Sequence, residues 1–514
     1  MKRPPKQDNT AKKRIGLILG PALAIATLLS GGISSPDAIV IRAAAVAILM
    51  AVWWITEAIP IPATALLPVA LFPVLGILSG KATAATYFNH VIFLFIGGFV
   101  MALAMQRWNL HKRIALRIVM ALGTGPRQLI LGFMVATAFL SMWISNTATT
   151  MMMVPIAIAV IMRFRVDAPG SHTRGFATGL MIGIAYAAST GGIATLIGTP
   201  PNLSFSRIFA IVYPNGPEIA FADWLFFALP CSVIMLFLAW WLVTRLFVPR
   251  EFTAGQEKST LRDEYQSLGK LSYEEKIVGL LFTLMALLWV FRKRISLGGI
   301  DIPGWSEVLP AARFIDDGTV AICIAVVLFL WPSKSKPKER LMDWNSAVRL
   351  PWGIVILFGG GFALATGFVE SGLSLFIAEQ LTVLKEVPSV VLIGSTCTVM
   401  TFLTELTSNT ATTEMVLPLM GSLSHAIQVN PLLLMIPATL AASCAFMLPV
   451  ATPPNAIVFG SGEVRMSDMI KAGIILNLAG VVVIVAVTFL LGMAVFNIEP
   501  GVMPDWAVPA GKPG

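Results

Sequence analysis

A six-residue phrase that occurs twice constrains this chain more than any other feature of its sequence. Ser145–Thr150 reads Ser-Asn-Thr-Ala-Thr-Thr, and Ser408–Thr413 repeats it letter for letter. A second phrase, Thr-Pro-Pro-Asn, follows the two copies at similar distances, at Thr199–Asn202 and Thr452–Asn455. Two polar motifs and two proline breaks, duplicated within apolar sequence, predict two structural repeats.

The composition around these motifs is that of a membrane protein. Of the 514 residues, 56% are hydrophobic and only 12% are charged, whereas soluble domains carry about 25% charged residues. Apolar runs approach the ~20 residues that cross a bilayer at Ile15–Ser30, Ala38–Ile55, Val91–Met105, Trp224–Val248 and Ile474–Phe496. The first run lacks a small-residue cleavage site, so we interpret it as a helix and not as a signal peptide. We therefore predict an all-α polytopic protein surrounded by membrane lipid. The net charge of +9 is concentrated in loops and gives little support for nucleic-acid binding.

The flanks of the first hexamer are basic on both sides. Arg107–Arg127 holds five basic residues and no acid, and Arg163–Arg174 is also basic. Positively charged flanks lie in the cytoplasm, so both ends of the intervening segment, Gln128–Met162, lie on that side. We predict a re-entrant hairpin whose two half-length helices meet at Ser145–Thr147 and open to the cytoplasm. Leu110–Leu122 is predicted to form an amphipathic helix on the cytoplasmic surface.

The second hexamer has the opposite surroundings. Its upstream flank, Glu370–Glu386, is mostly acidic, so the hairpin Pro388–Ile427 is predicted to open outward. Basic residues mark further cytoplasmic segments at Lys2–Arg14, Pro249–Lys276 and Lys334–Arg349. The resulting scheme has about eleven spans besides the hairpins, with the N-terminus inside and the C-terminus outside. Arg292–Arg294 falls on the outer side and fits the scheme poorly. Opposed hairpins imply inverted repeats with a site between them near the bilayer midplane.

The duplicated motifs offer ligands for both signs of charge. Helix N-termini at the hairpin tips present backbone N–H groups that favour anions. Hydroxyl, amide and freed carbonyl oxygens suit a small hard cation, and proline frees the carbonyl one turn before it. Neither Gln128–Ile161 nor Val387–Val464 contains Lys or Arg. A bound anion would therefore need its balancing charge from a bound cation, and sodium suits these neutral oxygens.

The same residues also have purely structural explanations. A single Ser-Asn-Thr in a membrane helix is usually interhelical glue, but two identical copies in opposed hairpins argue for a site. Gly97–Gly98 and Gly359–Gly361 are interpreted as close helix contacts. Intramembrane carboxylates are functional suspects, yet Glu405 and Glu414 lack counterparts in the first repeat and rank below the duplicated residues. No His-Glu-x-x-His motif, no pair of intramembrane aspartates and no Ser-His pairing near the repeats supports an enzyme, and a duplicated midplane site argues against a channel.

On these residues the chain resembles the divalent anion/sodium symporter family. The resemblance covers nearly the whole chain and rests on Trp53–Pro60, both Ser-Asn-Thr motifs and both Thr-Pro-Pro-Asn breaks. It implies a homodimer in a bacterial inner membrane, in which a transport domain moves like an elevator against a scaffold domain. The implied division is scaffold 1–124, transport 125–248, cytoplasmic loop 249–276, scaffold 277–385, transport 386–498 and tail 499–514.

The resemblance also implies two sodium sites and one substrate site. The first sodium would be bound by Ser141, Ser145, Asn146 and the Gly198 carbonyl, and the second by Thr404, Thr407, Asn409 and the Ala451 carbonyl. The substrate carboxylates would meet Ser145, Asn146, Thr147, Thr199, Pro200, Ser408, Asn409, Thr410, Thr452 and Pro453.

The sequence leaves two functional alternatives beside the leading one. We expect sodium-coupled symport of a di- or tricarboxylate, foremost a C4-dicarboxylate such as succinate, malate or fumarate. Exchange of dicarboxylates, or of citrate for succinate, and transport of sulfate remain open.

Overall fold

The protein is almost entirely helical in the parts that the computed structural model describes. These are residues 10–30, 38–123, 125–167, 171–249, 258–297, 300–499 and 501–508. Within them the sheet structure is one antiparallel pair, β1 (Ile295–Leu297) and β2 (Ile300–Ile302). The prediction of an all-α protein is confirmed. The basic residues Lys2, Arg3 and Lys6, most of the loop after Pro249 and the end of the tail lie outside the described residues.

The helices fall into two groups along the chain, one on each side of the segment 250–257. Before it come α1 (Thr10–Ser30), α2 (Ala38–Thr56), α3 (Ile61–Thr64), α4 (Leu67–Val74), α5 (Gly80–Tyr87), α6 (His90–Arg107), α7 (Leu110–Ala121), α8 (Pro126–Ser141), α9 (Asn146–Asp167), α10 (Ser171–Gly192), α11 (Pro200–Val212) and α12 (Phe221–Phe247). After it come α13 (Lys258–Ser267), α14 (Tyr273–Val290), α15 (Asp317–Leu330), α16 (Trp344–Ala347), α17 (Trp352–Ser371), α18 (Leu373–Leu381), α19 (Ser389–Thr404), α20 (Asn409–Ile427), α21 (Leu432–Ala442), α22 (Pro453–Gly460), α23 (Met466–Val487) and α24 (Met493–Val495). A π-helical turn, Thr488–Gly492, joins α23 to α24, and short 3₁₀ turns lie at Trp305–Val308, Ala312–Phe314, Thr382–Glu386 and Asp505–Ala507.

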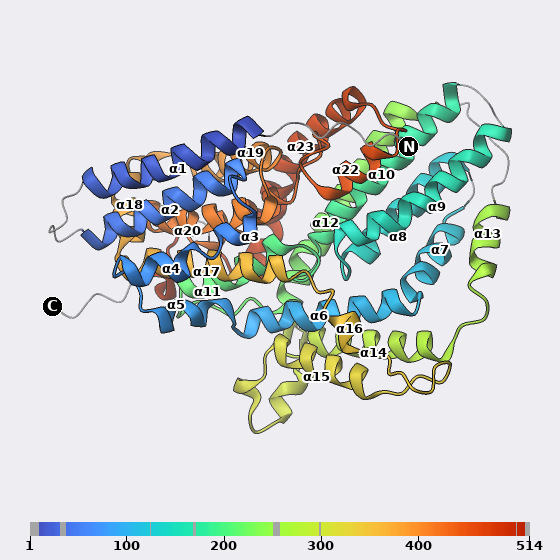
Figure 1. The fold of residues 1–514 in the computed structure, drawn as a ribbon, viewed down its shortest axis with the longest axis horizontal. Helices are drawn as coiled ribbons and strands as arrows, with labels where there is room; N and C mark the ends of the chain where they lie inside the picture. Colours follow the sequence, from blue (N-terminus) through green and yellow to red (C-terminus); the bar gives the residue numbers. More distant parts are fainter. Residues whose placement is uncertain are drawn as a thin grey trace.

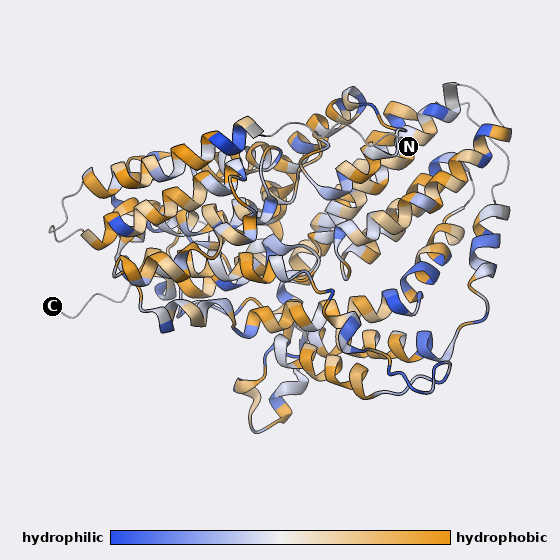
Figure 2. Cartoon of the chain, viewed as in Figure 1, coloured by the Kyte–Doolittle hydropathy of each residue, from blue (hydrophilic) through white to orange (hydrophobic). Residues whose placement is uncertain are grey.

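Apolar helices long enough for a bilayer dominate the described chain. By length and composition, seven segments of the described chain qualify, and five shorter apolar helices accompany them. Hydrophobic residues cover the outer helices, while hydrophilic residues gather in connecting segments (Figure 2). The shorter helices include both first halves of the expected hairpins, α8 and α19. The count of about eleven spans and the orientation of the termini stay predictions.

Both predicted hairpin breaks occur where the hexamers stand. The first falls between the end of α8 and the start of α9 at Asn146, and the second between the end of α19 and the start of α20 at Asn409. The pair α8–α9 and the helix α20 occupy opposite halves of the long axis (Figure 1). The predicted amphipathic segment is also helical, as α7.

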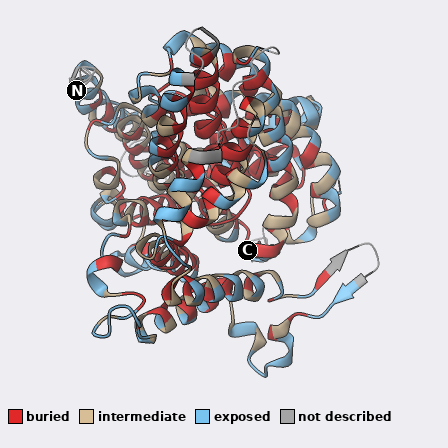
Figure 3. Cartoon of the chain, turned by 90° about the vertical axis from the view of Figure 1, so that its right-hand side faces the viewer, coloured by how far each residue is buried: buried red, intermediate tan, exposed pale blue. Residues whose placement is uncertain are grey.

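Packing joins the two repeats at the centre of the molecule. Helix α10 packs on α8, α9 and α12, and α21 packs on α19 and α20. Helix α11, from the first half, lies against α20 from the second. Buried residues concentrate where these helices meet, and the β1–β2 hairpin projects away from them (Figure 3). The interrupted elements thus lie in the densely packed, buried part of the fold.

The poorly fitting basic cluster Arg292–Arg294 is neutralised by ion pairs. Arg292 is 3% exposed and contacts Asp317 at 2.5 Å and Glu218 at 2.6 Å. Lys293 reaches the other oxygen of Glu218, also at 2.6 Å. The positive-inside rule counts only the basic residues of a segment. It therefore overstates the positive charge of Arg292–Arg294, because acids distant in sequence neutralise that charge.

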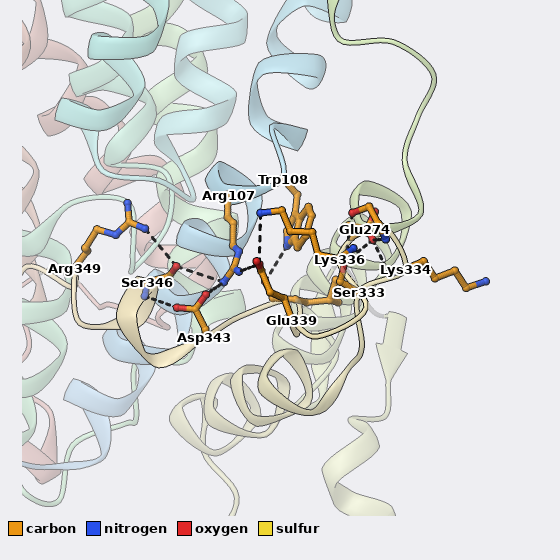
Figure 4. Close-up of polar contacts among 12 residues, drawn as sticks. Arg107, Trp108, Glu274, Ser333, Lys334, Lys336, Glu339, Asp343, Ser346 and Arg349 are labelled. Atoms are coloured by element: carbon orange, nitrogen blue, oxygen red, sulfur yellow. Dashed lines mark hydrogen bonds and ion pairs between the residues drawn. The ribbon is translucent and has the colours of Figure 1, made fainter.

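A second polar cluster fastens the segment between α15 and α16 (Figure 4). Arg107, at the end of α6, pairs with Glu339 at 2.5 Å and with Asp343. The Glu274 carboxylate, at the start of α14, accepts hydrogen bonds of 2.8 Å from the Ser333 hydroxyl and from two backbone N–H groups of the same segment. Burial alone would raise the pKa of Glu274, but these hydrogen bonds lower the pKa to about 2. This carboxylate is therefore ionised wherever the protein is folded at ordinary pH.

Candidate functional site

Four interrupted helices begin at the duplicated motifs. Helices α9 and α20 start within the two hexamers, and α11 and α22 start with the prolines of the two Thr-Pro-Pro-Asn phrases. Proline favours the first helical position because its missing N–H would have no intrahelical partner there. The preceding Thr199 and Thr452 are extended, at φ −140° and −138°. The extended threonine therefore interrupts the preceding helical structure, and the proline after it starts the new helix at a fixed residue.

Side chains cap three of these helix starts. The Ser145 hydroxyl accepts a hydrogen bond from the Ala148 N–H at 3.3 Å, and the Ser408 hydroxyl accepts one from the Ala411 N–H at 3.5 Å. Thr452 caps α22 in the same way. These contacts fix the first turn of each helix and leave other backbone donors at the helix ends unpaired within the helix.

All four helix starts face one cavity of about 890 Å³. Every residue predicted to meet the substrate lines this cavity: Ser145, Asn146, Thr147, Thr199, Pro200, Ser408, Asn409, Thr410, Thr452 and Pro453. The sequence-distant motifs are thus brought together, as the inverted-repeat interpretation requires. A helix N-terminus carries about half a positive charge, so the cavity attracts an anion from four directions.

The cavity also contains charge that the sequence interpretation did not place there. Its charged lining residues are Lys12 and Glu57, both outside the two hairpins. The expectation that the protein supplies no fixed cation near the site is wrong, since it considered only the hairpins and their breaks. Lys12 reaches the cavity from α1, whose distance from the motifs along the chain hid the contact.

Behind the first motif lies a compact group of oxygen atoms. The Ser141 hydroxyl donates to Asn146 Oδ1 at 2.6 Å and lies 2.7 Å from the Ala188 carbonyl oxygen. Ser141 is fully buried, whereas Ser145, Asn146 and Gly198 line the cavity. Hydroxyl, amide and carbonyl oxygens at these separations form a donor set suited to a small cation at the cavity wall.

The second motif repeats this geometry. The Thr404 hydroxyl donates to Asn409 Oδ1 at 2.6 Å and lies 2.9 Å from the Ala442 carbonyl oxygen. Thr404 is fully buried, and Ala451 lines the cavity. Thr407 also lines the cavity, but its hydroxyl bonds to the Leu403 carbonyl and to the Thr412 hydroxyl. By position in the repeat, Ser408 and not Thr407 corresponds to Ser145.

Two buried asparagines leave matched acceptor oxygens at the two breaks. The Asn202 amide nitrogen donates to the Thr195 carbonyl at 2.7 Å, and that of Asn455 donates to the Leu448 carbonyl at 3.0 Å. The oxygen Oδ1 of each asparagine is buried and accepts no hydrogen bond from the described residues. Buried acceptors are normally satisfied, so a matched pair of unpaired oxygens at the two breaks favours cation binding there.

Gly192, at the end of α10, is a site residue that the sequence interpretation missed. A Cβ atom at this position would lie 2.6 Å from Asn146 Oδ1. Only a glycine lets the Asn146 side chain approach the backbone this closely. The corresponding position of the second repeat is Ala445, so spacing from the Thr-Pro-Pro-Asn phrase could not single out Gly192.

The two intramembrane glutamates lie outside the cavity lining. Glu405 is buried and accepts hydrogen bonds from the Met447 and Leu448 N–H groups at 2.8 and 2.9 Å. Glu414 bonds to Ser204 and packs against Gly361. Glu405 therefore holds the interrupted segment before α22, and Glu414 lies where α20, α11 and α17 meet.

A family model and several known proteins match nearly the whole chain. Residues 22–498 match the model of a family described as the sodium:sulfate symporter transmembrane region. A sodium-dependent dicarboxylate transporter of Staphylococcus saprophyticus is 44% identical over 94% of this chain and 92% of its own length. Its counterpart from Staphylococcus aureus is 41% identical over 96% of this chain and 94% of its own length.

Solved structures share the fold at low sequence identity. The Neisseria gonorrhoeae MtrF structure aligns with a TM-score of 0.54 at 15% identity, covering 80% of this chain and 84% of that one. The Alcanivorax borkumensis YdaH transporter aligns with a TM-score of 0.52 at 15% identity, covering 82% and 88%. The overall arrangement of helices is therefore shared with solved structures.

Proposed function

The chain belongs to the sodium:sulfate symporter family, and on that premise we propose that it is a secondary transporter that moves dicarboxylates together with sodium ions. One observation carries this proposal: four helix N-termini and two matched oxygen groups line or adjoin a single cavity. The arrangement binds an anion and small cations next to one another.

A C4-dicarboxylate is the substrate class that the cavity favours. Two Ser-Asn-Thr motifs face the same space, so each can meet one carboxylate of a short diacid. The relatives named above are dicarboxylate transporters, which supports succinate, malate and fumarate as the substrates to try first. Sulfate has a single charged centre and would engage the two motifs less fully.

The sodium ions are assigned to the two oxygen groups. The first site takes Ser141, Ser145, Asn146 and the Gly198 carbonyl, and the second takes Thr404, Asn409, the Ala451 carbonyl and Thr407. When bound, each ion supplies positive charge beside the substrate carboxylates. The chain's own part is to hold these neutral oxygens in place and to direct helix N-termini at the anion.

The transport step is assigned to an elevator-like movement within a homodimer. Residues 125–248 and 386–498 would move against a scaffold of residues 1–124 and 277–385, with a cytoplasmic loop at 249–276 and a tail from 499. One apolar cluster supports this division, since its buried members come from α2 to α5, α17 and α18, apart from Ala411 of α20. We place the protein in the bacterial inner membrane, N-terminus inside and C-terminus outside.

Reconstitution in proteoliposomes tests this function. An inward sodium gradient should accelerate uptake of labelled succinate, and unlabelled malate or fumarate should compete better than sulfate. Uptake that ignores sodium would exclude the symport. Uptake that requires preloaded dicarboxylate would identify an exchanger instead.

A further inference from the structure

Lys12 occupies a distinctive position at the substrate cavity. It belongs to the first turn of α1 and lines the cavity together with both hairpin tips. Its Nζ donates to the Leu406 carbonyl at 3.5 Å, two residues before the Ser408 cap of α20. An ammonium group from the N-terminal helix therefore stands beside the second Ser-Asn-Thr motif.

The packing of α1 explains why this lysine, and not a neighbour, reaches the cavity. Lys12, Gly16 and Gly20 follow one another at four-residue intervals, so they share one face of the helix. A Cβ at Gly16 would lie 2.0 Å from the Thr56 hydroxyl, and one at Gly20 would lie 2.7 Å from the Trp53 ring. This face is thus pressed against α2, which ends at Thr56. Lys12 lies one turn beyond that contact, where α2 has ended and the cavity begins.

Within the described part of the chain, Lys12 pairs with no carboxylate, and its ammonium contacts only the Leu406 carbonyl oxygen. Glu57 lines the same cavity but forms no ion pair with Lys12 among the salt bridges of the described residues. An ammonium left unpaired at the wall of an anion-attracting cavity focuses the field on an entering anion.

We propose that Lys12 is a substrate-binding group that selects doubly charged anions at the mouth of the cavity. This inference rests on the proposed transport of dicarboxylates by the same site. The two helix starts of one repeat hold one carboxylate, and the Lys12 ammonium contacts the second carboxylate as the substrate enters or leaves. A monoanion lacks that second charge and gains nothing from Lys12.

The contact between Lys12 and Leu406 also predicts that Lys12 affects substrate binding from one face of the membrane more than from the other. Lys12 lies in the range assigned to the scaffold, and Leu406 lies in the range assigned to the moving part. The elevator movement would separate them, so Lys12 serves the conformation that opens toward the N-terminal end of α1. Its removal should raise the half-saturating substrate concentration more on one face of the membrane than on the other.

Paired substitutions at adjacent lysines test the proposal. K12A and K13A remove the same charge from the same turn, but Lys13 is exposed and does not line the cavity. In proteoliposomes with an inward sodium gradient, K12A should raise the half-saturating succinate concentration about tenfold, while K13A should match the wild type. K12R should restore most of the affinity. Monomethyl succinate, a monoanion, should be handled alike by K12A and wild type.

Two results would overturn the assignment. Equal kinetics for K12A and K13A would show that Lys12 contributes only to the general positive charge of the N-terminus. An equal loss of affinity for succinate and for its monoester in K12A would show that Lys12 does not bind the second carboxylate. Wild-type vesicles that fail to take up succinate with sodium would instead refute the proposed function itself. Equal elution of all variants in size-exclusion chromatography controls for misfolding.

Discussion

The Glu405 carboxylate accepts a hydrogen bond of 2.8 Å from the Asn477 side-chain amide. The same carboxylate accepts the N–H groups of Met447 and Leu448. It therefore joins the end of α19, the interrupted segment before α22 and helix α23. In the first repeat, Met142 stands at the equivalent position, and its carbonyl accepts the Thr195 hydroxyl at 2.5 Å. The two repeats thus hold the end of the first hairpin helix against the interrupted segment by different hydrogen bonds.

Removing this carboxylate should destabilise the second cation site selectively. E405A leaves three donors unpaired, the buried Asn477 amide and the partly buried N–H groups of Met447 and Leu448, and a buried donor left unpaired costs about 1–3 kcal/mol. We expect a lower melting temperature in detergent and a higher sodium concentration for half-maximal succinate uptake. M142L, the matched change in the first repeat, should leave both quantities near wild type. An E405A variant that melts and binds sodium normally would show that Glu405 does not position this segment.

The asparagines at the hairpin tips should be indispensable to coupling. Asn146 and Asn409 each bring an amide oxygen within 2.6 Å of a buried hydroxyl. N146A and N409A should each abolish sodium-driven uptake, with elution and helical content unchanged. The sodium-induced rise in melting temperature should shrink in both variants. Normal sodium-dependent uptake in both would refute the site assignment.

A methyl group at Gly192 should disable the first site alone. In G192A the new Cβ would stand 2.6 Å from Asn146 Oδ1, so the amide must move away. We expect sodium affinity to fall about tenfold or more, as for a displaced ligand shell. The reciprocal variant A445G removes a methyl group from the second repeat and serves as the matched control. Similar sodium titrations for G192A and wild type would argue against a cation at Asn146.

Glu274 should make stability depend on acid pH. Its pKa falls from the ordinary 4.5 to about 2 in the folded protein. A group whose pKa is lowered by folding stabilises the fold above the unfolded pKa, and the contribution disappears as pH falls through the folded pKa. E274Q should therefore have a lower melting temperature than wild type at pH ~7, and this difference in melting temperature should narrow as the pH falls from ~4.5 toward ~2.

A surface acid provides the comparison for Glu274. Glu264 pairs with Lys112 at 2.8 Å and is 38% exposed, and such pairs contribute little to stability. E264Q should therefore change the melting temperature little at either pH. If the difference in melting temperature between E274Q and wild type stays constant with pH, the charge of Glu274 is not what stabilises the contact at the start of α14.

Local sequence patterns predicted the interrupted helices well, because proline and capping residues act where they stand. The hexamers and the Thr-Pro-Pro-Asn phrases placed all four breaks, and the structure brings Ser141 and Thr404 against Asn146 and Asn409. Lys12 and Gly192 escaped prediction because their roles depend on contacts with residues far along the chain. Arg292 fitted poorly for the same reason, since its partners Glu218 and Asp317 are distant in sequence.

Succinate binding to the purified protein in sodium chloride and in choline chloride tests the central claim most directly. The two oxygen groups and the four helix starts form one site only if the cation and the anion bind together. Labelled succinate should therefore bind to the wild type in sodium and be lost in choline. N146A should bind little succinate in either salt. Equal binding in the two salts would contradict a shared sodium and dicarboxylate site.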